Sequence, residues 1–183
     1  RLVETPIDLI NIPHPIVAFT GALDEYKFDK DLFKKVVADY PGYSFVVVGP
    51  AALKDKDISS KQLGFGDTKN VYFLGTKAYE DMPKYLTSFD VMIIPYQLND
   101  YTVGGCFPVK FLDYLSAGLP VVVTDLPSYA PFSDVCYISK NPNEFSQNVR
   151  RALEENSQEK IKMREEQASK NTWEGKVFTL LDL

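Results

Sequence analysis

A glycine pair followed by an expected helix is the strongest candidate for an anion site in this sequence. Gly104 and Gly105 form the pair, and Pro108 stands where the helix is expected to begin. Free backbone N–H groups and the positive end of a helix favour a bound anion, and glycines let a phosphate approach without obstruction by side chains. The predicted binding loop consists of Gly104, Gly105, Cys106 and Phe107. Lys110 lies one turn into the expected helix, where a position on the helix surface is common for a lysine.

A second candidate loop follows the apolar run over residues 16–20. Gly21 lets the backbone turn tightly there, and Lys27 places a mobile cation near the end of the expected strand. A lone lysine in an acidic loop is also commonly just solvated, so both interpretations stand at this point. Gly49 ends another apolar run in the same way. Neither a Walker motif nor GxGxxG occurs, so ATP hydrolysis and standard dinucleotide binding have no support.

Short apolar runs alternate with helical patterns along the chain, and these elements must position the loops. The expected strands are Ile16–Thr20, Phe45–Val48, Val71–Leu74, Asp90–Ile94, Val121–Val123 and Val135–Ile138. The expected helices are Asp31–Tyr40, Ala78–Ser88, a segment from Pro108 up to Gly118, Phe145–Leu153, Gln158–Ala168 and Trp173–Leu181. Residues 54–69 are expected to form a long polar loop.

Strands rich in Val and Ile on both faces are buried on both faces, which indicates a parallel sheet with helices on each side. Six strand–helix units predict an α/β fold with a Rossmann-like, doubly wound sheet of about six strands. Ligands of such folds lie beyond the carboxyl ends of the strands. The candidate loops are therefore those after Gly21, Gly49, Gly75, Pro95 and Thr124.

Composition excludes several classes of function. The chain is 45% hydrophobic and 25% charged, as an ordinary globular domain is, and its net charge of −5 does not attract nucleic acid or an anionic membrane. No apolar run approaches the roughly 20 residues of a membrane-spanning helix. Two cysteines and one histidine without a CxxC motif are too few for a structural zinc site, so we expect no metal and a reducing, cytosolic compartment.

The prolines of the first 15 residues favour extended backbone. We therefore expect residues 1–14 to be an inter-domain linker, residues 15–183 to be one folded domain, and the chain to be part of a longer protein. His14 within this linker is expected to be solvated, and Trp173 in the last expected helix is expected to be a packing anchor.

The segment Phe107–Val122 resembles a block of the glycosyltransferases that have the two-domain GT-B fold, "P-x-K-x-x-E-Y-x-A-x-G-x-P-V-V". More narrowly, it resembles the retaining family-four group (glycosyl transferases group one), which builds bacterial surface polysaccharides. Residues 71–75 are similar to that group's "V-x-F-x-G", and residues 86–95 to its "aDv-x-x-x-P". With two weaker matches nearer the N-terminus, the resemblance covers about residues 13–175.

The resemblance implies that residues 15–183 are the C-terminal, nucleotide-sugar-binding half of such an enzyme, and that the N-terminal acceptor-binding domain is absent. The implied reaction is metal-independent, retaining transfer of a sugar from a UDP- or GDP-linked donor to a saccharide or lipid-linked acceptor. The half expected here would bind the donor weakly and turn over little. Any contact with the inner face of the membrane would belong to the missing half.

The resemblance also assigns roles to single residues. Asp113 stands where the family has a glutamate that holds the ribose hydroxyls, and a carboxylate suits a diol because it accepts two hydrogen bonds. Eight residues earlier, Gly105 replaces the acid that contacts the donor sugar, with Asp100 and Asn99 as the candidate substitutes. Because Asp is one methylene shorter than Glu, the ribose contact is expected to be longer or shifted.

The family's phosphate motif, "G-R-x-x-x-x-K-G", is only partly kept after the first expected strand. Gly21 and Lys27 match it, whereas Ala22 and Phe28 replace the Arg and the second Gly. Lys27 is thus the implied partner of the diphosphate, and Lys110 the second cation; both would stabilise the leaving group.

Three further interpretations stay open. Val71 and Phe73 either border the nucleobase or are plain core residues of a strand. A GT-B epimerase acting on UDP-N-acetylglucosamine needs acidic and histidine side chains at the cleft, which fits poorly with His14 as the single histidine. A non-catalytic Rossmann-like binding module, or a degenerate transferase subunit, is kept open by Gly105 and Ala22.

Overall fold

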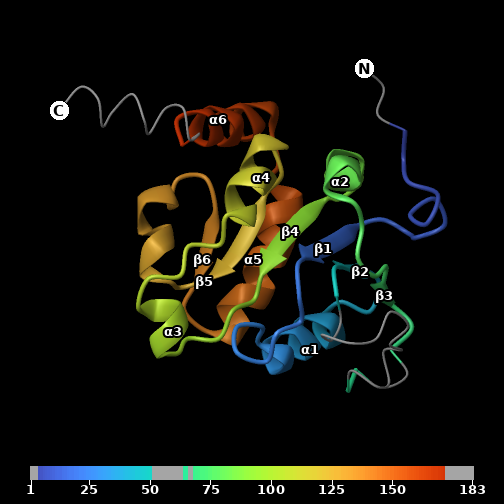
Figure 1. Ribbon diagram of the computed structural model, residues 1–183, viewed down its shortest axis with the longest axis horizontal. Helices are drawn as coiled ribbons and strands as arrows, with labels where there is room; N and C mark the ends of the chain where they lie inside the picture. The colour runs from blue at the N-terminus through green and yellow to red at the C-terminus, as the bar shows by residue number, and fades with distance from the viewer. Residues whose placement is uncertain (1–3, 51–63, 66–67, 172–183) are drawn as a thin grey trace.

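The computed structural model describes residues 4–50, 64–65 and 68–171, which form a six-stranded parallel sheet (Figure 1). The strands are β1 (Ile16–Thr20), β2 (Ser44–Val48), β3 (Val71–Phe73), β4 (Val91–Ile94), β5 (Val121–Thr124) and β6 (Tyr137–Ser139). Their order across the sheet is β3-β2-β1-β4-β5-β6, and every neighbouring pair is parallel. This is the doubly wound order, so the predicted Rossmann-like fold class is confirmed.

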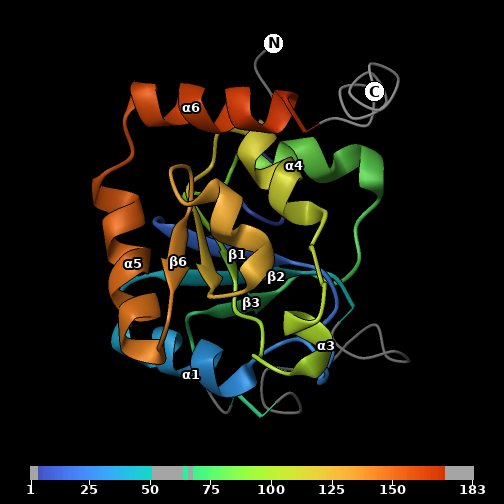
Figure 2. The ribbon, with the colours of Figure 1, turned by 90° about the vertical axis from the view of Figure 1, so that its left-hand side faces the viewer.

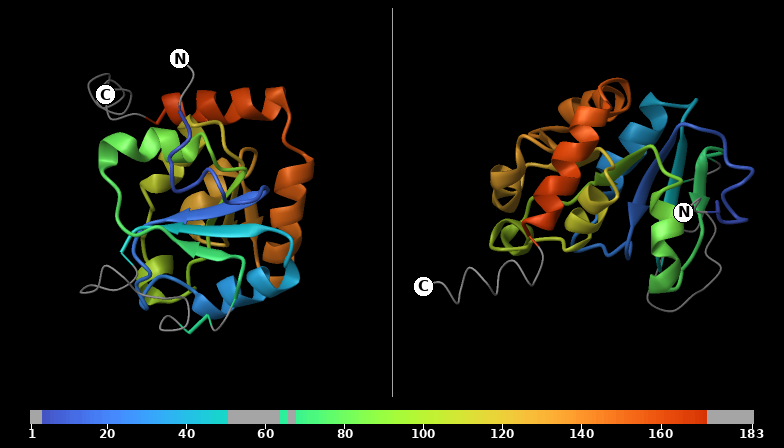
Figure 3. Two further views of the ribbon diagram at one scale, coloured as in Figure 1. Left: turned by 90° about the vertical axis from the view of Figure 1, so that its right-hand side faces the viewer. Right: turned by 90° about the horizontal axis from the view of Figure 1, so that it is seen from above.

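Helices cover both faces of this sheet. They are α1 (Lys30–Asp39), α2 (Met82–Leu86), α3 (Asp100–Val103), α4 (Lys110–Ser116), α5 (Pro142–Glu154) and α6 (Gln158–Ser169), with the 3-10 helices η1 (Tyr79–Asp81) and η2 (Pro127–Phe132). The left view of Figure 3 shows α1 on one side of the sheet and α2 and α6 on the other. On the first side α1 packs against α5, which covers β4, β5 and β6. On the other side α4 contacts β5 and packs against α6, which lies across it in Figure 2.

The core sits within the sheet and on both of its faces. Every side chain of β2, β4 and β5 is buried, which requires cover on both sides of each strand. Strands that are buried on both faces have no solvent-facing side chains, so polar residues do not alternate with apolar ones along them. This is why short apolar runs predicted the strands.

Two helices differ from the prediction, and prolines explain both. The helix expected over Ala78–Ser88 is the 3-10 turn η1 followed by the five-residue α2, with Pro83 in the first turn of α2. The helix expected from Pro108 begins at Lys110, because the carbonyl of Pro108 accepts the N–H of Phe111 at 2.9 Å in a tight preceding turn. Proline tends to stand at the start of a helix, but one residue cannot fix the boundary.

Other expectations shift or cannot be compared. The strand expected from Val135 begins at Tyr137, because the carbonyl of Phe132 accepts the N–H groups of both Val135 and Cys136 and keeps them in the turn after η2. The expected helix Trp173–Leu181 and most of the expected loop 54–69 lie outside the described residues.

The described part of the predicted linker packs against the domain. Its residues 6–12 form two turns, in which Leu9 donates to the carbonyl of Pro6 and Ile12 to that of Leu9. Leu9 and Ile12 are buried in the core. His14 is mostly exposed, as expected, and its Nδ1 lies 2.6 Å from a carboxylate oxygen of Asp90.

The sheet has its topological switch point between β1 and β4. The chain leaves β1 toward α1 on one face and leaves β4 toward α4 on the other, and ligands of such sheets bind beyond the carboxyl ends at this point. Across the described residues, no helix is both long enough and apolar enough to cross a membrane.

Candidate functional site

A cavity of about 620 Å³ lies beyond the carboxyl ends of β1 and β2, between α2 and α4. Four of the predicted site residues line it: Gly21, Gly49, Lys110 and Asp113. The segment after β3 closes one end with Thr76, Lys77 and Tyr79. The structure thus brings residues 92 positions apart into one cavity, at the edge of the sheet where the fold class predicts a ligand.

Close backbone packing explains the two glycines on the floor of this cavity. Gly49 has φ +143°, and a Cβ there would strike the carbonyl group of Gly21. Gly21 has φ +128°, and a Cβ there would strike Nζ of Lys110. Their N–H groups are used within the fold: Gly21 donates to the carbonyl of Val48 at 2.8 Å, and Gly49 to that of Gly75 at 2.9 Å. The glycines therefore shape the floor and leave room above it.

Lys110 projects from the first turn of α4 to the end of β1. Its Nζ donates to the backbone carbonyl of Thr20 at 2.5 Å and lies 4.1 Å from the ring centre of Phe19 and 5.4 Å from that of Tyr96. Burial lowers the pKa of Lys110 to about 7, and the nearby charge of Lys27 acts in the same direction. Lys110 is therefore a partly buried lysine whose ammonium contacts a neutral carbonyl and ring faces, and the surface interpretation is wrong.

Tyr114 fixes the strand end to which Lys110 bonds. Its hydroxyl lies 3.1 Å from the N–H of Thr20, which donates to it, and 2.7 Å from the Thr20 hydroxyl. Both Tyr114 and Lys110 come from α4, so this helix and the end of β1 are held as one unit.

Asp113 lies three residues beyond Lys110 on the same helix and also faces the cavity. It is half-buried, and burial raises the pKa of its carboxyl. Among the described residues no cationic side chain forms an ion pair with it. Its carboxylate oxygens are therefore available to hydroxyl donors of a ligand.

Lys27 lies beside the cavity and not in its wall. Its carbonyl accepts the N–H of Gln97 at 2.7 Å, and its Nζ lies 5.4 Å from the ring centre of Tyr101. The positive charge of Lys27 acts on Lys110, since it contributes to lowering the pKa of Lys110. The two predicted cations are thus neighbours, although only Lys110 lines the cavity.

The glycine pair belongs to a turn that sequence reasoning missed. Gly104 ends α3 and donates its N–H to the carbonyl of Asp100 at 2.9 Å, so this N–H is not free, contrary to the prediction. Within the described hydrogen bonds, the N–H groups of Gly105, Cys106 and Phe107 have no acceptor. The predicted binding loop is therefore shortened to these three amides, and none of them lines the cavity.

Asn99 and Asp100 were the expected substitutes for the acid that Gly105 replaces. The Asn99 side chain accepts from the N–H of Thr102 in a capping box and donates to the carbonyl of Tyr26, so Asn99 is engaged and Asp100 stays exposed. The spacing Asn99-x-x-Thr102 is the signal that could have predicted α3.

Val71 and Phe73 lie outside the cavity lining, so the core interpretation holds and the nucleobase interpretation is corrected. Val71 is buried in β3, and the ring of Phe73 packs on Phe65 with centres 5.7 Å apart. The two residues are two positions apart and so share one face of β3, and the half-buried Phe73 packs against the core. The cavity wall begins after this strand, in the loop after Gly75 that the fold class had singled out.

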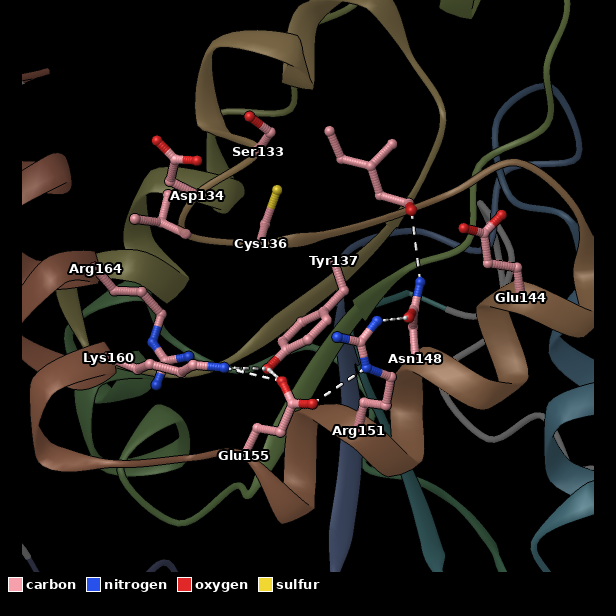
Figure 4. Close-up of a pocket in the computed structure, with 12 residues that line it drawn as sticks. Ser133, Asp134, Cys136, Tyr137, Glu144, Asn148, Arg151, Glu155, Lys160 and Arg164 are labelled. Carbon is pink, nitrogen blue, oxygen red and sulfur yellow. Dashed lines mark hydrogen bonds and ion pairs between the residues drawn. The ribbon is translucent and has the colours of Figure 1, made fainter.

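A second cavity, of about 300 Å³, lies along β6, at the edge of the sheet (Figure 4). The Glu155 carboxylate sits between Lys160 and Arg151, at 2.9 Å and 3.2 Å, and these contacts lower the pKa of Glu155 to about 2. Both cations also lie 5.6 Å from the ring centre of Tyr137. These three charged side chains thus bind one another, whereas Arg164 in the same lining bonds to the neutral carbonyl of Gly118 and the side chain of Asn156.

Comparison with solved structures shows the same fold in other proteins. Sucrose-phosphate synthase from Thermosynechococcus elongatus matches with a TM-score of 0.72 and 17% identity, over 98% of this chain and 50% of that one. HepE from Anabaena, solved in complex with UDP-glucose, matches with a TM-score of 0.51 and 16% identity, over 92% of this chain and 49% of that one. The chain thus spans about half of each of these structures.

Comparison with curated proteins and families identifies the family. A Bacillus subtilis strain 168 protein, named as the teichuronic acid biosynthesis glycosyltransferase TuaH, is 33% identical over 113 residues, which are 62% of this chain and 27% of that protein. The sequence model of the family described as "Glycosyl transferases group 1" matches residues 14–155, most of the chain. The chain therefore belongs to the group 1 glycosyltransferases.

Proposed function

We propose that residues 15–183 are the donor-binding half of an enzyme that transfers a sugar from a nucleotide diphosphate sugar to a saccharide or lipid-linked acceptor. The observation that carries this proposal is the cavity in which Lys110 and Asp113 stand side by side over the floor of Gly21 and Gly49. A second domain of a longer protein would bind the acceptor, and residues 1–14 would connect the two. The protein would then act in the cytoplasm and reach the inner membrane face through that other domain.

The diphosphate is proposed to lie at the end of β1. Lys110 and Lys27 supply positive charge there, and the amides of Gly105, Cys106 and Phe107 supply donors close by. When the bond from the sugar to the diphosphate breaks, negative charge grows on the leaving group, and fixed cations stabilise it without reorganisation. Because these side chains provide that charge, the proposed transfer needs no resident metal. Retention of the anomeric configuration is proposed by resemblance to the family.

The ribose is proposed to bind Asp113, whose carboxylate can accept from both hydroxyls. The base would then lie at the end of the cavity formed by Thr76, Tyr79 and Met82. UDP and GDP share the ribose and the diphosphate that this proposal uses, and the UDP-glucose complex of HepE supports a uridine donor through likeness of fold.

Calorimetric titration of the 183-residue chain with UDP and GDP tests the proposal. Binding of one of them in the micromolar to millimolar range is expected, with loss of binding in Lys110→Met and in Asp113→Ala. If neither nucleotide binds at millimolar concentration, the proposal is wrong.

A non-catalytic nucleotide-binding module is the second candidate. It is favoured by Gly105 and Ala22, which lack the side chains that the family has at these positions. Lys27→Ala and Asp113→Ala in the longer protein separate the two: sugar transfer that is unchanged by both substitutions would favour the module.

A further inference from the structure

An acid of the N-terminal segment reaches the end of the cavity that lies farthest from β1. A carboxylate oxygen of Asp8 lies 2.7 Å from Nζ of Lys77. The Tyr85 hydroxyl donates to the same carboxylate, at 2.9 Å and 3.0 Å from its two oxygens. The buried neighbours Leu9 and Ile12 anchor the segment in the core. Asp8 is thus held firmly although it precedes the first strand.

Lys77 belongs to the end of the cavity where the base is proposed to lie. It lines the cavity in the loop after β3, and β3 is separated from β1 by two strand spacings, about 10 Å. The diphosphate is proposed at β1, beside Gly21 and Lys110. Neighbouring wall residues at the Lys77 end are largely apolar, including Tyr79 and Met82, which suits a planar base.

Asp8 determines where the charge of Lys77 sits. Its hydrogen bond raises the pKa of Lys77, so the ammonium stays protonated and paired. Burial acts to raise the pKa of Asp8, but the bonds from Lys77 and Tyr85 outweigh it and the pKa lies below its ordinary value. Lys77 thus lines the cavity with its ammonium held by Asp8, and the aliphatic stem of a lysine held by its charged end can serve as apolar wall. Without Asp8, the carboxylate that holds the Lys77 ammonium is lost, and the side chain no longer has a fixed position in the wall.

We propose that Asp8 is a positioning residue for the nucleobase: by holding Lys77, it fixes the wall against which the base of the donor lies. This inference rests on the proposed function, because it takes the occupant of the cavity to be a nucleoside diphosphate.

The test compares a ligand that has a base with one that lacks it. Dissociation constants for UDP and for inorganic pyrophosphate are measured by calorimetry on the 183-residue chain and on Asp8→Asn. We expect roughly 5- to 10-fold weaker binding of UDP and less than about two-fold change for pyrophosphate, whose site at β1 does not include Lys77. Asp81→Asn is the matched control, since it breaks an exposed ion pair with Lys84 at 3.1 Å near the same helix and should change neither constant.

A double-mutant cycle separates positioning from general loss of stability. In Lys77→Met, which keeps the stem and removes the charge, Asp8→Asn should weaken UDP binding no further. Tyr85→Phe is the milder variant for use if Asp8→Asn does not fold, with an expected two- to three-fold loss of UDP affinity alone.

The outcomes are distinguishable. Equal weakening of UDP and pyrophosphate binding by Asp8→Asn, or a lower melting temperature with both constants unchanged, would overturn this inference and leave the proposed function standing. Failure of the unsubstituted chain to bind UDP would overturn both.

Discussion

The cavity beyond β1 and the cavity along β6 both contain charged side chains, but most of the first lining is uncharged and the two arrange their charges differently. In the first, Lys110 contacts a neutral carbonyl and ring faces, and Asp113 has no cationic partner among the described residues. In the second, Glu155 is bound by both Lys160 and Arg151. A half-buried charge without a counter-charge costs free energy of folding, so Lys110 and Asp113 favour a ligand, whereas the paired group around Glu155 favours a structural role. Each cavity also holds the opposite case, since Lys77 in the first is paired with Asp8 and Arg164 in the second bonds to the neutral groups of Gly118 and Asn156.

The backbone differs between the two regions as well. Glycines with positive φ form the floor at β1, whereas side chains from α5 and α6 cover the edge strand β6. There the Asn148 amide donates to the Ser139 hydroxyl at 3.0 Å, and Tyr137 lies between two cations. Covering an edge strand in this way protects it from pairing with another chain. Backbone thus forms the floor of the first cavity, whereas interacting side chains line the second.

The largest expected effect comes from breaking the floor of the first cavity. Gly49→Ala should destabilise the fold by about 2–4 kcal/mol, because the new Cβ meets the Gly21 backbone and alanine disfavours φ +143°. Urea unfolding measures the change. Gly42→Ala is the control, since its Cβ would meet no atom within 4 Å, and its stability should change by less than about 0.5 kcal/mol. Equal losses would show that the close approach at Gly49 is unimportant.

Replacing one lysine in each cavity should show which of the two cavities binds UDP. Lys110→Met should weaken UDP binding by roughly 10- to 150-fold, because a charge-assisted hydrogen bond to the diphosphate is lost. Lys160→Met removes the same charge from the β6 cavity and should leave the dissociation constant of UDP unchanged. Calorimetry measures both. A comparable loss in Lys160→Met would place the nucleotide at β6 instead.

Removing the carboxylate of Asp113 should lower the affinity for UDP less than removing the charge of Lys110. Asp113→Asn is expected to weaken UDP binding about ten-fold, because the carboxylate no longer accepts from both ribose hydroxyls. The same substitution should not affect binding of 2′,3′-dideoxyuridine diphosphate, which lacks those hydroxyls. If both ligands lose affinity equally, Asp113 does not bind the ribose.

A pH titration should reveal Lys110 directly. Its pKa of about 7 in the empty cavity should rise when the diphosphate binds, so its contribution to affinity is complete below pH 7 and is lost as the pH rises through the higher, bound value. The dissociation constant of UDP should therefore increase several-fold between pH 7 and pH 9, and binding should take up protons near pH 7.5. Lys110→Met should show neither effect, and a slope that persists in this variant would contradict the assignment.

The smallest effect is expected in the β6 cavity. Its paired partners lower the pKa of Glu155 to about 2, so the stability it contributes is present above its unfolded pKa near 4.5 and is lost as the pH falls toward 2. Glu155→Gln should therefore lower the melting temperature slightly at pH 7 and not at pH 2, without changing UDP affinity. A change in UDP affinity would mean that the two cavities are coupled.

The sheet and the turn glycines could be predicted from the sequence because their signals are local. Runs of Val and Ile without polar alternation indicate strands buried on two faces, and Gly21 and Gly49 mark the points where two of these strands end. The position of Asp113 in the cavity followed from the block of residues around it. Such patterns can be recognised from residues that are close together in the sequence.

The remaining features depend on contacts between distant positions. Whether Lys110 lies on a surface or in the cavity is decided by Thr20, ninety residues earlier. The ion pair between Asp8 and Lys77 connects two segments that are distant in the sequence. The prolines predicted extended backbone for the segment that contains Asp8, and the loop that contains Lys77 has no motif. The helix α3 has four residues, too few for a periodic pattern, and Val71 and Phe73 gave the same apolar signal for a core strand as for a nucleobase wall.

The place of the Lys110 ammonium beside Gly21 also restricts which sequences this fold can accept. Position 21 is restricted twice: its φ of +128° disfavours any residue with a Cβ, and the Lys110 ammonium occupies the volume that this Cβ would need. In homologous chains that keep this backbone we therefore expect glycine at position 21, whatever residue stands at position 110.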